Sequence, residues 1–167
     1  FRKPLSRLVL ERSCETTGPI NGEIGFNVAE MATVAERLLR DIGLTRNFSR
    51  LVAVIGHGSE SLNNPHKSAY DCGACGGSPG APNSRALAQM LNDPRVRKRI
   101  AANGIAIPED TWFLGGYHNT CNDTVIIADR DRLPATHRHE FERLTETFEA
   151  VCERNAHERC RRFMSAP

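Results

Sequence analysis

The feature that most constrains the fold is an uninterrupted apolar run, Leu51-Val52-Ala53-Val54-Ile55, which leads directly into Gly56-His57-Gly58-Ser59. A continuous apolar run of this length predicts a strand that is covered on both faces, and such strands belong to parallel sheets. In open α/β sheets, ligands bind in the crevice at the carboxyl ends of the strands. The polar residues after Ile55 are therefore expected to lie at a ligand-binding edge.

Helix signals lie on both sides of this strand. Asn27 is a predicted N-cap with Glu30 three residues later, a capping-box arrangement, and Gly43 is expected to close that helix. Asn83 is the predicted cap of a second helix, and Asp93-Pro94 begins a third. Apolar residues at helical spacing predict a last helix from about His137. These helices flank the predicted sheet.

Two further strands are predicted, from Thr111 to Tyr117 and, shorter, from Thr124 to Ala128. Together the elements predict a single α/β domain with a parallel sheet over residues 1–167. Its N-terminal part, residues 1–26, is expected to be irregular. The chain opens with Phe1-Arg2-Lys3-Pro4 and no initiator Met, so we expect it to be a fragment of a longer protein.

Composition narrows the class of protein. The chain has 167 residues, of which 40% are hydrophobic and 25% charged, as expected of a globular domain with a real core. The formal net charge is only +2, so no nucleic-acid partner is predicted. No apolar run approaches the roughly 20 residues that a membrane-spanning helix needs.

We expect the cysteines to be reduced thiols rather than a disulfide framework, because long helices and a buried strand are not features of small disulfide-rich domains. The chain has six of them: Cys14, Cys72, Cys75, Cys121, Cys152 and Cys160. Cys152 and Cys160 fall on the predicted last helix, where we expect them to be small packing residues.

The loop after the first strand is the predicted functional segment. It is long, from Leu62 to Pro82, and together with the end of the strand it supplies many metal-binding or polar groups: His57, Asn63, Asn64, His66, Asp71, Cys72 and Cys75. Zinc binds histidine nitrogen and cysteine thiolate. His57 and Cys72 supply one of each and are the predicted metal ligands. A closed site needs about four ligands, so Cys75, Asp71, His118 or groups outside the chain must complete it.

The Cys72-Gly73-Ala74-Cys75 motif has three interpretations: two metal ligands, a redox dithiol, or one ligand beside a packing thiol. A redox pair usually opens a helix directly after a strand, and the Gly76-Gly77-Ser78-Pro79-Gly80 sequence that follows argues against it. Gly73, Gly76 and Gly77 allow close backbone approach to an anion, or simply a tight turn.

Histidines elsewhere have weaker signals. His118 follows a predicted strand and either faces the same crevice or is hydrogen-bonded at the sheet edge. Cys121-Asn122-Asp123 is a less favoured donor group. His66 is expected to be structural or supporting. The remaining three, on the last helix, are expected to be solvated: His137, His139 and His157.

Several of these motifs together resemble one family closely. They are Val54-Ile55-Gly56-His57-Gly58-Ser59, Asn63-Asn64-Pro65-His66, Asp71-Cys72-Gly73-Ala74-Cys75-Gly76-Gly77, Asn83-Ser84-Arg85-Ala86-Leu87-Ala88 and His118-Asn119-Thr120. The family is the large zinc-binding (DabA-type) subunit of the DAB inorganic-carbon-accumulating complexes. The similarity runs from about Gly25 to the end of the chain.

The resemblance implies a β-carbonic-anhydrase-like fold and a zinc site held by two cysteines, a histidine and an aspartate. His57 and Cys72 match the family's histidine and second cysteine ligands, whereas Cys75 matches a family cysteine that is not expected to be a ligand. The other two ligands and a catalytic Asp–Arg pair belong to a Cys-x-Asp-x-Arg strand, which this sequence lacks and which is expected upstream. The chain alone is therefore predicted to be inactive.

The resemblance further implies that zinc-bound hydroxide hydrates CO2 to bicarbonate. The implied partner is a membrane-embedded, ion-translocating subunit, which would hold the protein peripherally at the cytoplasmic face of the inner membrane. Two alternatives remain open. One is a non-catalytic metal or iron–sulfur module that uses Cys72, Cys75 and Cys121; the other is an interaction domain whose cysteines are structural.

Overall fold

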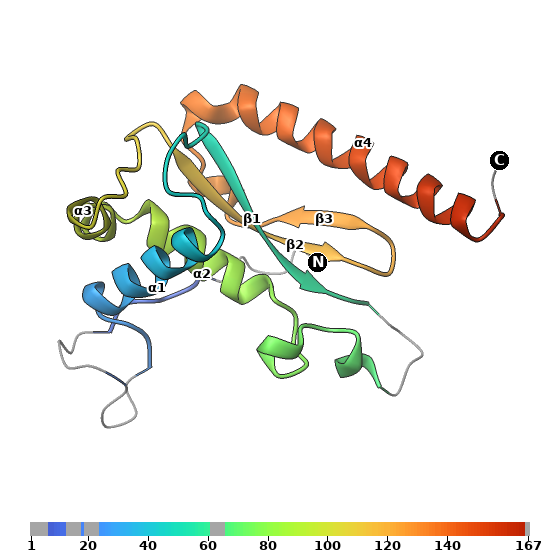
Figure 1. Cartoon of the computed structure of the whole chain (residues 1–167), viewed down its shortest axis with the longest axis horizontal. Helices are drawn as coiled ribbons and strands as arrows, with labels where there is room; N and C mark the ends of the chain where they lie inside the picture. The colour runs from blue at the N-terminus through green and yellow to red at the C-terminus, as the bar shows by residue number, and fades with distance from the viewer. Residues whose placement is uncertain (1–6, 13–17, 19–23, 61–65, 166–167) are drawn as a thin grey trace.

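A three-stranded mixed sheet forms the centre of the computed structural model, which describes residues 7–12, 18, 24–60 and 66–165. Its strands are β1 (Leu51–Gly58), β2 (Trp112–Asn119) and β3 (Thr124–Ile127), in the order β1-β2-β3 (Figure 1). β1 and β2 are parallel, as predicted, but β3 is antiparallel to β2. The prediction of a wholly parallel sheet is therefore wrong, because the short turn at residues 120–123 can only reverse the chain.

The helices confirm most of the sequence signals. They are α1 (Val28–Asp41), α2 (Ala81–Asn92), α3 (Pro94–Ala102) and α4 (Arg138–Arg162). Asn27 and Glu30 form the predicted capping box of α1, and Asp93 caps α3. α2 begins two residues before the predicted cap, Asn83. Gly80 occupies the N-cap position, and Pro82 lies in the first turn, where its missing N–H costs nothing.

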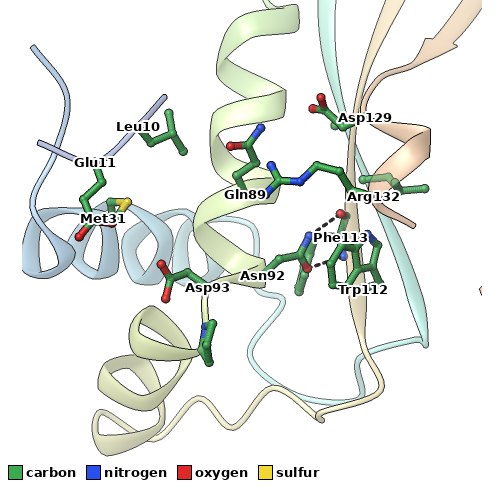
Figure 2. Close-up of a pocket in the computed structure, with 13 residues that line it drawn as sticks. Leu10, Glu11, Met31, Gln89, Asn92, Asp93, Trp112, Phe113, Asp129 and Arg132 are labelled. Atoms are coloured by element: carbon green, nitrogen blue, oxygen red, sulfur yellow. Dashed lines mark hydrogen bonds between the residues drawn. The ribbon is translucent and has the colours of Figure 1, made fainter. Parts of the chain in front are cut away.

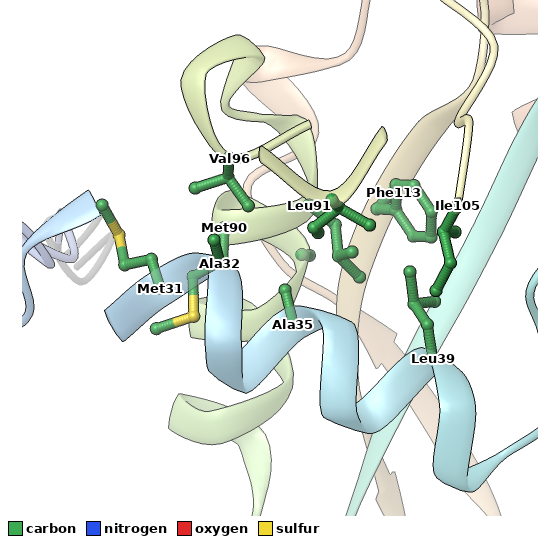
Figure 3. Close-up of a cluster of buried hydrophobic side chains, with 11 residues drawn as sticks. Met31, Ala32, Ala35, Leu39, Met90, Leu91, Val96, Ile105 and Phe113 are labelled. Atoms are coloured by element: carbon green, nitrogen blue, oxygen red, sulfur yellow. The ribbon is translucent and has the colours of Figure 1, made fainter. Parts of the chain in front are cut away.

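The main hydrophobic core lies between α1, α2, α3 and one face of the sheet. Figure 3 shows Ala35 and Leu39 of α1 beside Leu91 of α2, with Phe113 of β2 at the sheet side. These residues are at most 2% exposed. α2 lies close against β2, since a Cβ on Gly115 would come within 2.5 Å of Arg85 Cα. The core thus holds α2 across the parallel pair of strands.

The opposite face of the sheet carries α4 (Figure 1). Within the described residues α4 packs mainly against β3 and against a short 3-10 turn, η4 (Ala135–His137). None of its residues is fully buried; its apolar stripe is half-buried. Val125 and Ile127 of β3 line a groove of 410 Å³ with Phe148 and Cys152 of α4.

β1 is less covered than its sequence predicts. Residues Leu51 to Gly56 are all half-buried rather than buried, and β1 is an edge strand of the described sheet, paired with β2 alone. Its partial exposure follows from this position, because α4 lies over β3 at the other edge. The helices of the described ranges include none that is long and apolar enough to cross a membrane.

Candidate metal centre

His57 lies near the carboxyl end of β1, where its Cα is paired with that of His118 on β2. Its Nε2 is 2.9 Å from the carbonyl oxygen of Tyr70. A carbonyl oxygen only accepts hydrogen bonds, so Nε2 is the donor in this contact. The ring itself is solvent-exposed. The loop after β1 therefore holds the ring of one predicted ligand.

That loop contains two short 3-10 turns, η1 (Lys67–Ala69) and η2 (Gly73–Cys75), and Cys72 is the residue before η2. The Cys72 N–H donates to Ser78 O at 3.2 Å, and the Gly77 N–H donates back to Cys72 O at 3.1 Å. Gly76 and Gly77 have φ angles of 65° and 77°, which favour glycine. Their turn-forming role accounts for both glycines and closes a compact loop around Cys72.

The two thiols of the C-x-x-C motif are not equivalent. A hydrogen bond from Cys75 lowers the pKa of Cys72, as do the backbone amides of Cys75 and Ala74, while burial opposes the shift. The same hydrogen bond raises the pKa of Cys75, to whose sulfur Asn83 Nδ2 donates at 3.2 Å. The thiolate is the form that binds metals. Of the two thiols, Cys72 is thus the one that loses its proton more readily.

Asp71 is also in this loop, but its carboxylate is already engaged. One oxygen accepts the Ser59 N–H at 3.0 Å, and the other lies 2.6 Å from Lys67 Nζ. The Lys67 hydrogen bond is the main cause that holds the Asp71 pKa below its usual range, against the opposing effect of burial. Asp71 therefore braces the loop in this arrangement rather than offering a free ligand.

His118 is bound into a separate network. Its Nε2 lies 3.2 Å from Asp123 Oδ1, and the Asp123 side chain is only 4% exposed. Arg159 of α4 forms an ion pair with the same carboxylate, to which Asn155 also donates at 3.4 Å. Of the two alternatives for His118, the structure thus has the one in which its ring is hydrogen-bonded at the carboxyl end of the strand. Cys121, from the predicted donor group, instead lies 3.1 Å from Ser59 Oγ through its sulfur.

The chemistry of the donor set fits zinc, since His57 offers nitrogen and Cys72 a thiolate. These two donors are fewer than the about four that a closed zinc site needs. In the part of the chain that the structure describes, no three histidine, cysteine, aspartate or glutamate side chains are grouped to hold a metal ion. Asn63 and Asn64, two other polar residues of the loop, lie outside the described residues.

Some residues behave differently from the sequence prediction. His137 was expected to be solvated but is 4% exposed, because its Nε2 donates to Asp110 O at 2.6 Å and its Nδ1 lies beside Thr136. Cys160 was expected to pack, yet it is exposed near the end of α4; Cys152 is half-buried. His139 and His157 are exposed, as predicted. Hydrophobic spacing alone does not reveal which side of a helix finds a partner.

The sequence analysis did not identify Lys67, Ser59 or Tyr70, which hold the loop. Their signal was weak, since each acts through a backbone group or an ordinary ion pair. The i, i+4 spacing of Lys67 and Asp71 is the one local signal that could have indicated their ion pair.

A pocket of 360 Å³ lies elsewhere, between α2 and the beginning of β2 (Figure 2). Figure 2 shows Asn92 of α2 hydrogen-bonded to the backbone of Phe113. Its carboxylates are already paired: Asp129 with Arg85, and Glu11 and Asp93 with Arg95. The described residues that line it include no histidine or cysteine, and it lies at the opposite end of β2 from His118. It is therefore distinct from the candidate metal centre.

Comparison with known proteins identifies the family. The family model described as "Probable inorganic carbon transporter subunit DabA" matches residues 2–167. The chain is 49% identical over 166 residues to probable inorganic carbon transporter subunit DabA 2 of Rhodopirellula baltica, covering 99% of this chain and 16% of that protein. It is 48% identical over 144 residues to DabA1 of Halothiobacillus neapolitanus, covering 86% of this chain and 14% of that protein.

The matched region is a small part of these relatives, since the chain spans about a sixth of the length of the Rhodopirellula protein. No solved structure matches the chain. The similarity nevertheless covers almost all of the residues described above, including β1, its loop and α4. The chain belongs to the DabA family of inorganic carbon transporter subunits.

Proposed function

We propose that this chain supplies the histidine and cysteine half of a zinc site with carbonic-anhydrase-like activity, in a subunit of an inorganic carbon uptake complex. The observation that carries the proposal is the loop after β1. The His57 ring is held by the Tyr70 carbonyl, two residues before Cys72, so the same short segment positions both ligands. Family membership supports the substrate class, CO2 and bicarbonate.

The remaining ligands come from another part of the protein in this proposal. Among the described residues β1 is paired on one side only, and its apolar residues are half-buried. An edge strand presents unpaired backbone N–H and C=O groups that can accept another strand. A strand added in parallel would bring its own carboxyl end beside His57. We propose that the expected Cys-x-Asp-x-Arg strand occupies this edge and completes a β-carbonic-anhydrase-like sheet.

Each residue has a defined task in the completed site. His57 would bind zinc through nitrogen, with its ring orientation set by the Tyr70 carbonyl. Cys72 would bind as a thiolate, and Cys75 would support that charge by donating its S–H. When bound, zinc supplies the Lewis acidity that makes water reactive towards CO2 near neutral pH. The chain alone lacks the Asp–Arg pair, so we expect it to be inactive by itself.

The partners follow from the same proposal. The family description names a transporter subunit, which implies a complex with other subunits. We propose that the partner is a membrane-embedded, ion-translocating subunit and that the complex places this chain peripherally, at the cytoplasmic face of the inner membrane. Cation flow through the partner would then drive net bicarbonate accumulation.

The test is the metal content of the complete protein, measured by inductively coupled plasma mass spectrometry. We expect zinc in the parent protein and loss of most of it in His57→Ala and in Cys72→Ala, because each removes one of about four ligands. Cys75→Ala is the matched comparison: it removes the neighbouring thiol of the same motif, which supports Cys72 but is not a ligand, and it should therefore retain more zinc than either ligand variant. CO2 hydration, followed by stopped-flow pH change, should fall with the zinc.

Two results would contradict the proposal. Iron in place of zinc, lost equally in the Cys72 and Cys75 variants, would favour the alternative of an iron–sulfur module. Zinc that survives both His57→Ala and Cys72→Ala would mean that the metal is bound elsewhere and that these residues are structural.

A further inference from the structure

Asp71 is the most deeply buried charged group of the loop that follows β1. Its side chain is 1% exposed, and Asp71 immediately precedes Cys72. Burying a carboxylate is costly unless hydrogen bonds and an opposite charge compensate for the lost water. Here both are present, from the Ser59 N–H at 3.0 Å and from Lys67 Nζ at 2.6 Å. The question is what this buried carboxylate achieves.

The contacts of Asp71 and of its neighbour Tyr70 fix the position of the loop relative to the end of β1. Asp71 bonds to Ser59, and the preceding residue, Tyr70, bonds to the His57 ring. Two consecutive loop residues thus contact His57, near the end of the strand, and Ser59, the residue directly after it. Farther along, Gly80 N–H donates to His57 O at 2.7 Å. The segment that carries Cys72 is therefore tied to the strand end on both sides.

The hydrogen bond from Ser59 to Asp71 is costly to lose because Ser59 is itself only 1% exposed. Its backbone N–H cannot turn to water if the carboxylate is removed, and a buried donor without an acceptor is unfavourable. Lys67 differs, since its side chain is 48% exposed and can be hydrated when it loses Asp71. The bond to Ser59 thus determines where residue 71, and with it Cys72, must lie.

We propose that Asp71 is a positioning residue that sets the Cys72 thiolate relative to His57, so that the two can bind one metal ion. This inference rests on the proposed function of His57 and Cys72 as zinc ligands. Asp71 hydrogen-bonds to neither ligand side chain in the contacts described above. It acts through the Ser59 N–H, two residues after His57, and through its own backbone, which leads directly into Cys72. Groups that orient metal ligands typically change metal affinity by about 10- to 100-fold when they are removed.

The experiment measures zinc affinity of the complete protein by competition with a chromophoric chelator. Asp71→Ala should weaken zinc binding by about tenfold. Asp71→Asn keeps an oxygen that can accept from Ser59 but loses the charge that faces Lys67, so it should lose less affinity than Asp71→Ala. His57→Ala is measured in the same series as the test of the ligand assignment.

A matched control separates positioning from general stability. Asp129→Asn removes another partly buried carboxylate, which accepts from Arg85 at 2.7 and 2.9 Å, outside the loop. It should lower the midpoint of thermal unfolding without changing zinc affinity. Two readouts, zinc affinity and the unfolding midpoint, are therefore compared for each variant.

The inference is overturned if Asp71→Ala binds zinc as tightly as the parent, or if Asp71→Asn is as weak as Asp71→Ala. It is also overturned if Asp129→Asn weakens zinc binding as much as the Asp71 variants, because the effect would then follow stability. A parent protein without zinc, or an unaffected His57→Ala variant, would instead refute the proposed function, and the inference with it.

Discussion

At the scale of single residues, Glu30 shows how one side chain can join distant segments. Its carboxylate accepts the Asn27 N–H at 2.9 Å in the capping box, accepts the Gly18 N–H at 2.8 Å and pairs with Arg12 at 2.6 Å. These contacts lower the Glu30 pKa from 4.5 to about 2. The hydrogen bond from Arg12 has the largest effect, followed by those from the Gly18 and Asn27 amides. The capping-box glutamate of α1 thus also binds Arg12 and Gly18, which precede the helix.

This shift predicts acid sensitivity of a definite sign. A carboxyl group whose pKa is lower in the folded protein stabilises it above the unfolded pKa, and this stabilisation is lost as the pH falls towards the folded value. For Glu30 the window runs from about pH 4.5 down to about pH 2. In Glu30→Gln the thermal midpoint, followed by circular dichroism, should fall less over this window than in the parent. Glu153→Gln, at an exposed position of α4, should behave like the parent.

At the scale of elements, the packing of α2 on the sheet positions the loop after β1. Ser84 Oγ of α2 donates to Gly116 O of β2 at 2.6 Å, and Gly115 lies directly under Arg85. The end of that loop is equally tight, since a Cβ on Gly56 would come within 2.4 Å of Gly80 O. Glycines in the two strands therefore let the helix and the loop end approach the sheet closely.

Gly115→Ala should separate α2 from β2. The added Cβ would lie 2.5 Å from Arg85 Cα, a backbone atom that can move only with the helix. Overpacking of this kind costs about 1 to 3 kcal/mol. Urea unfolding should show a loss of that size, whereas Gly73→Ala, whose Cβ would meet nothing within 4 Å, should be close to neutral. Equal stability of the two variants would mean that α2 does not pack on β2 in this way.

At the scale of the whole molecule, coverage of the sheet is uneven. β2 has a neighbour on each side, whereas β1 has one. α1, α2 and α3 enclose a core on one face, while α4 lies over β3 on the other (Figure 1). Residues Leu51 to Gly56 of β1, which lead to His57, remain half-buried. An additional strand at that edge would bury them and supply the ligands that the proposed site needs.

Hydrogen exchange tests this arrangement. Backbone amides of β1 that are not bonded to β2 should exchange at least about tenfold more slowly in the complete protein than in the isolated chain, because a new strand would accept their hydrogen bonds. The amides of β2 are the internal control, since β2 is paired on both sides in either case. Fast exchange of the same β1 amides in the complete protein would show that the edge stays open.

Local features of the sequence predicted what depends on neighbouring residues. Asn27 with Glu30 and Asp93 with Pro94 correctly marked the beginnings of α1 and α3, because capping is a matter of a few adjacent backbone groups. The apolar run at Leu51 correctly marked β1 and its parallel pairing. His57 and Cys72 as zinc ligands remain predictions, which family membership supports.

Contacts between distant segments were decided only in the tertiary structure. The burial of His137 depends on Asp110 O, far away in the sequence, and the brace of Asp71 depends on the Ser59 backbone. A backbone group has no sequence signature, because every residue except proline carries the same N–H. The sequence by itself thus determined the elements and the donor chemistry of the site. The fold decided which donors are free and which already hold the loop in place.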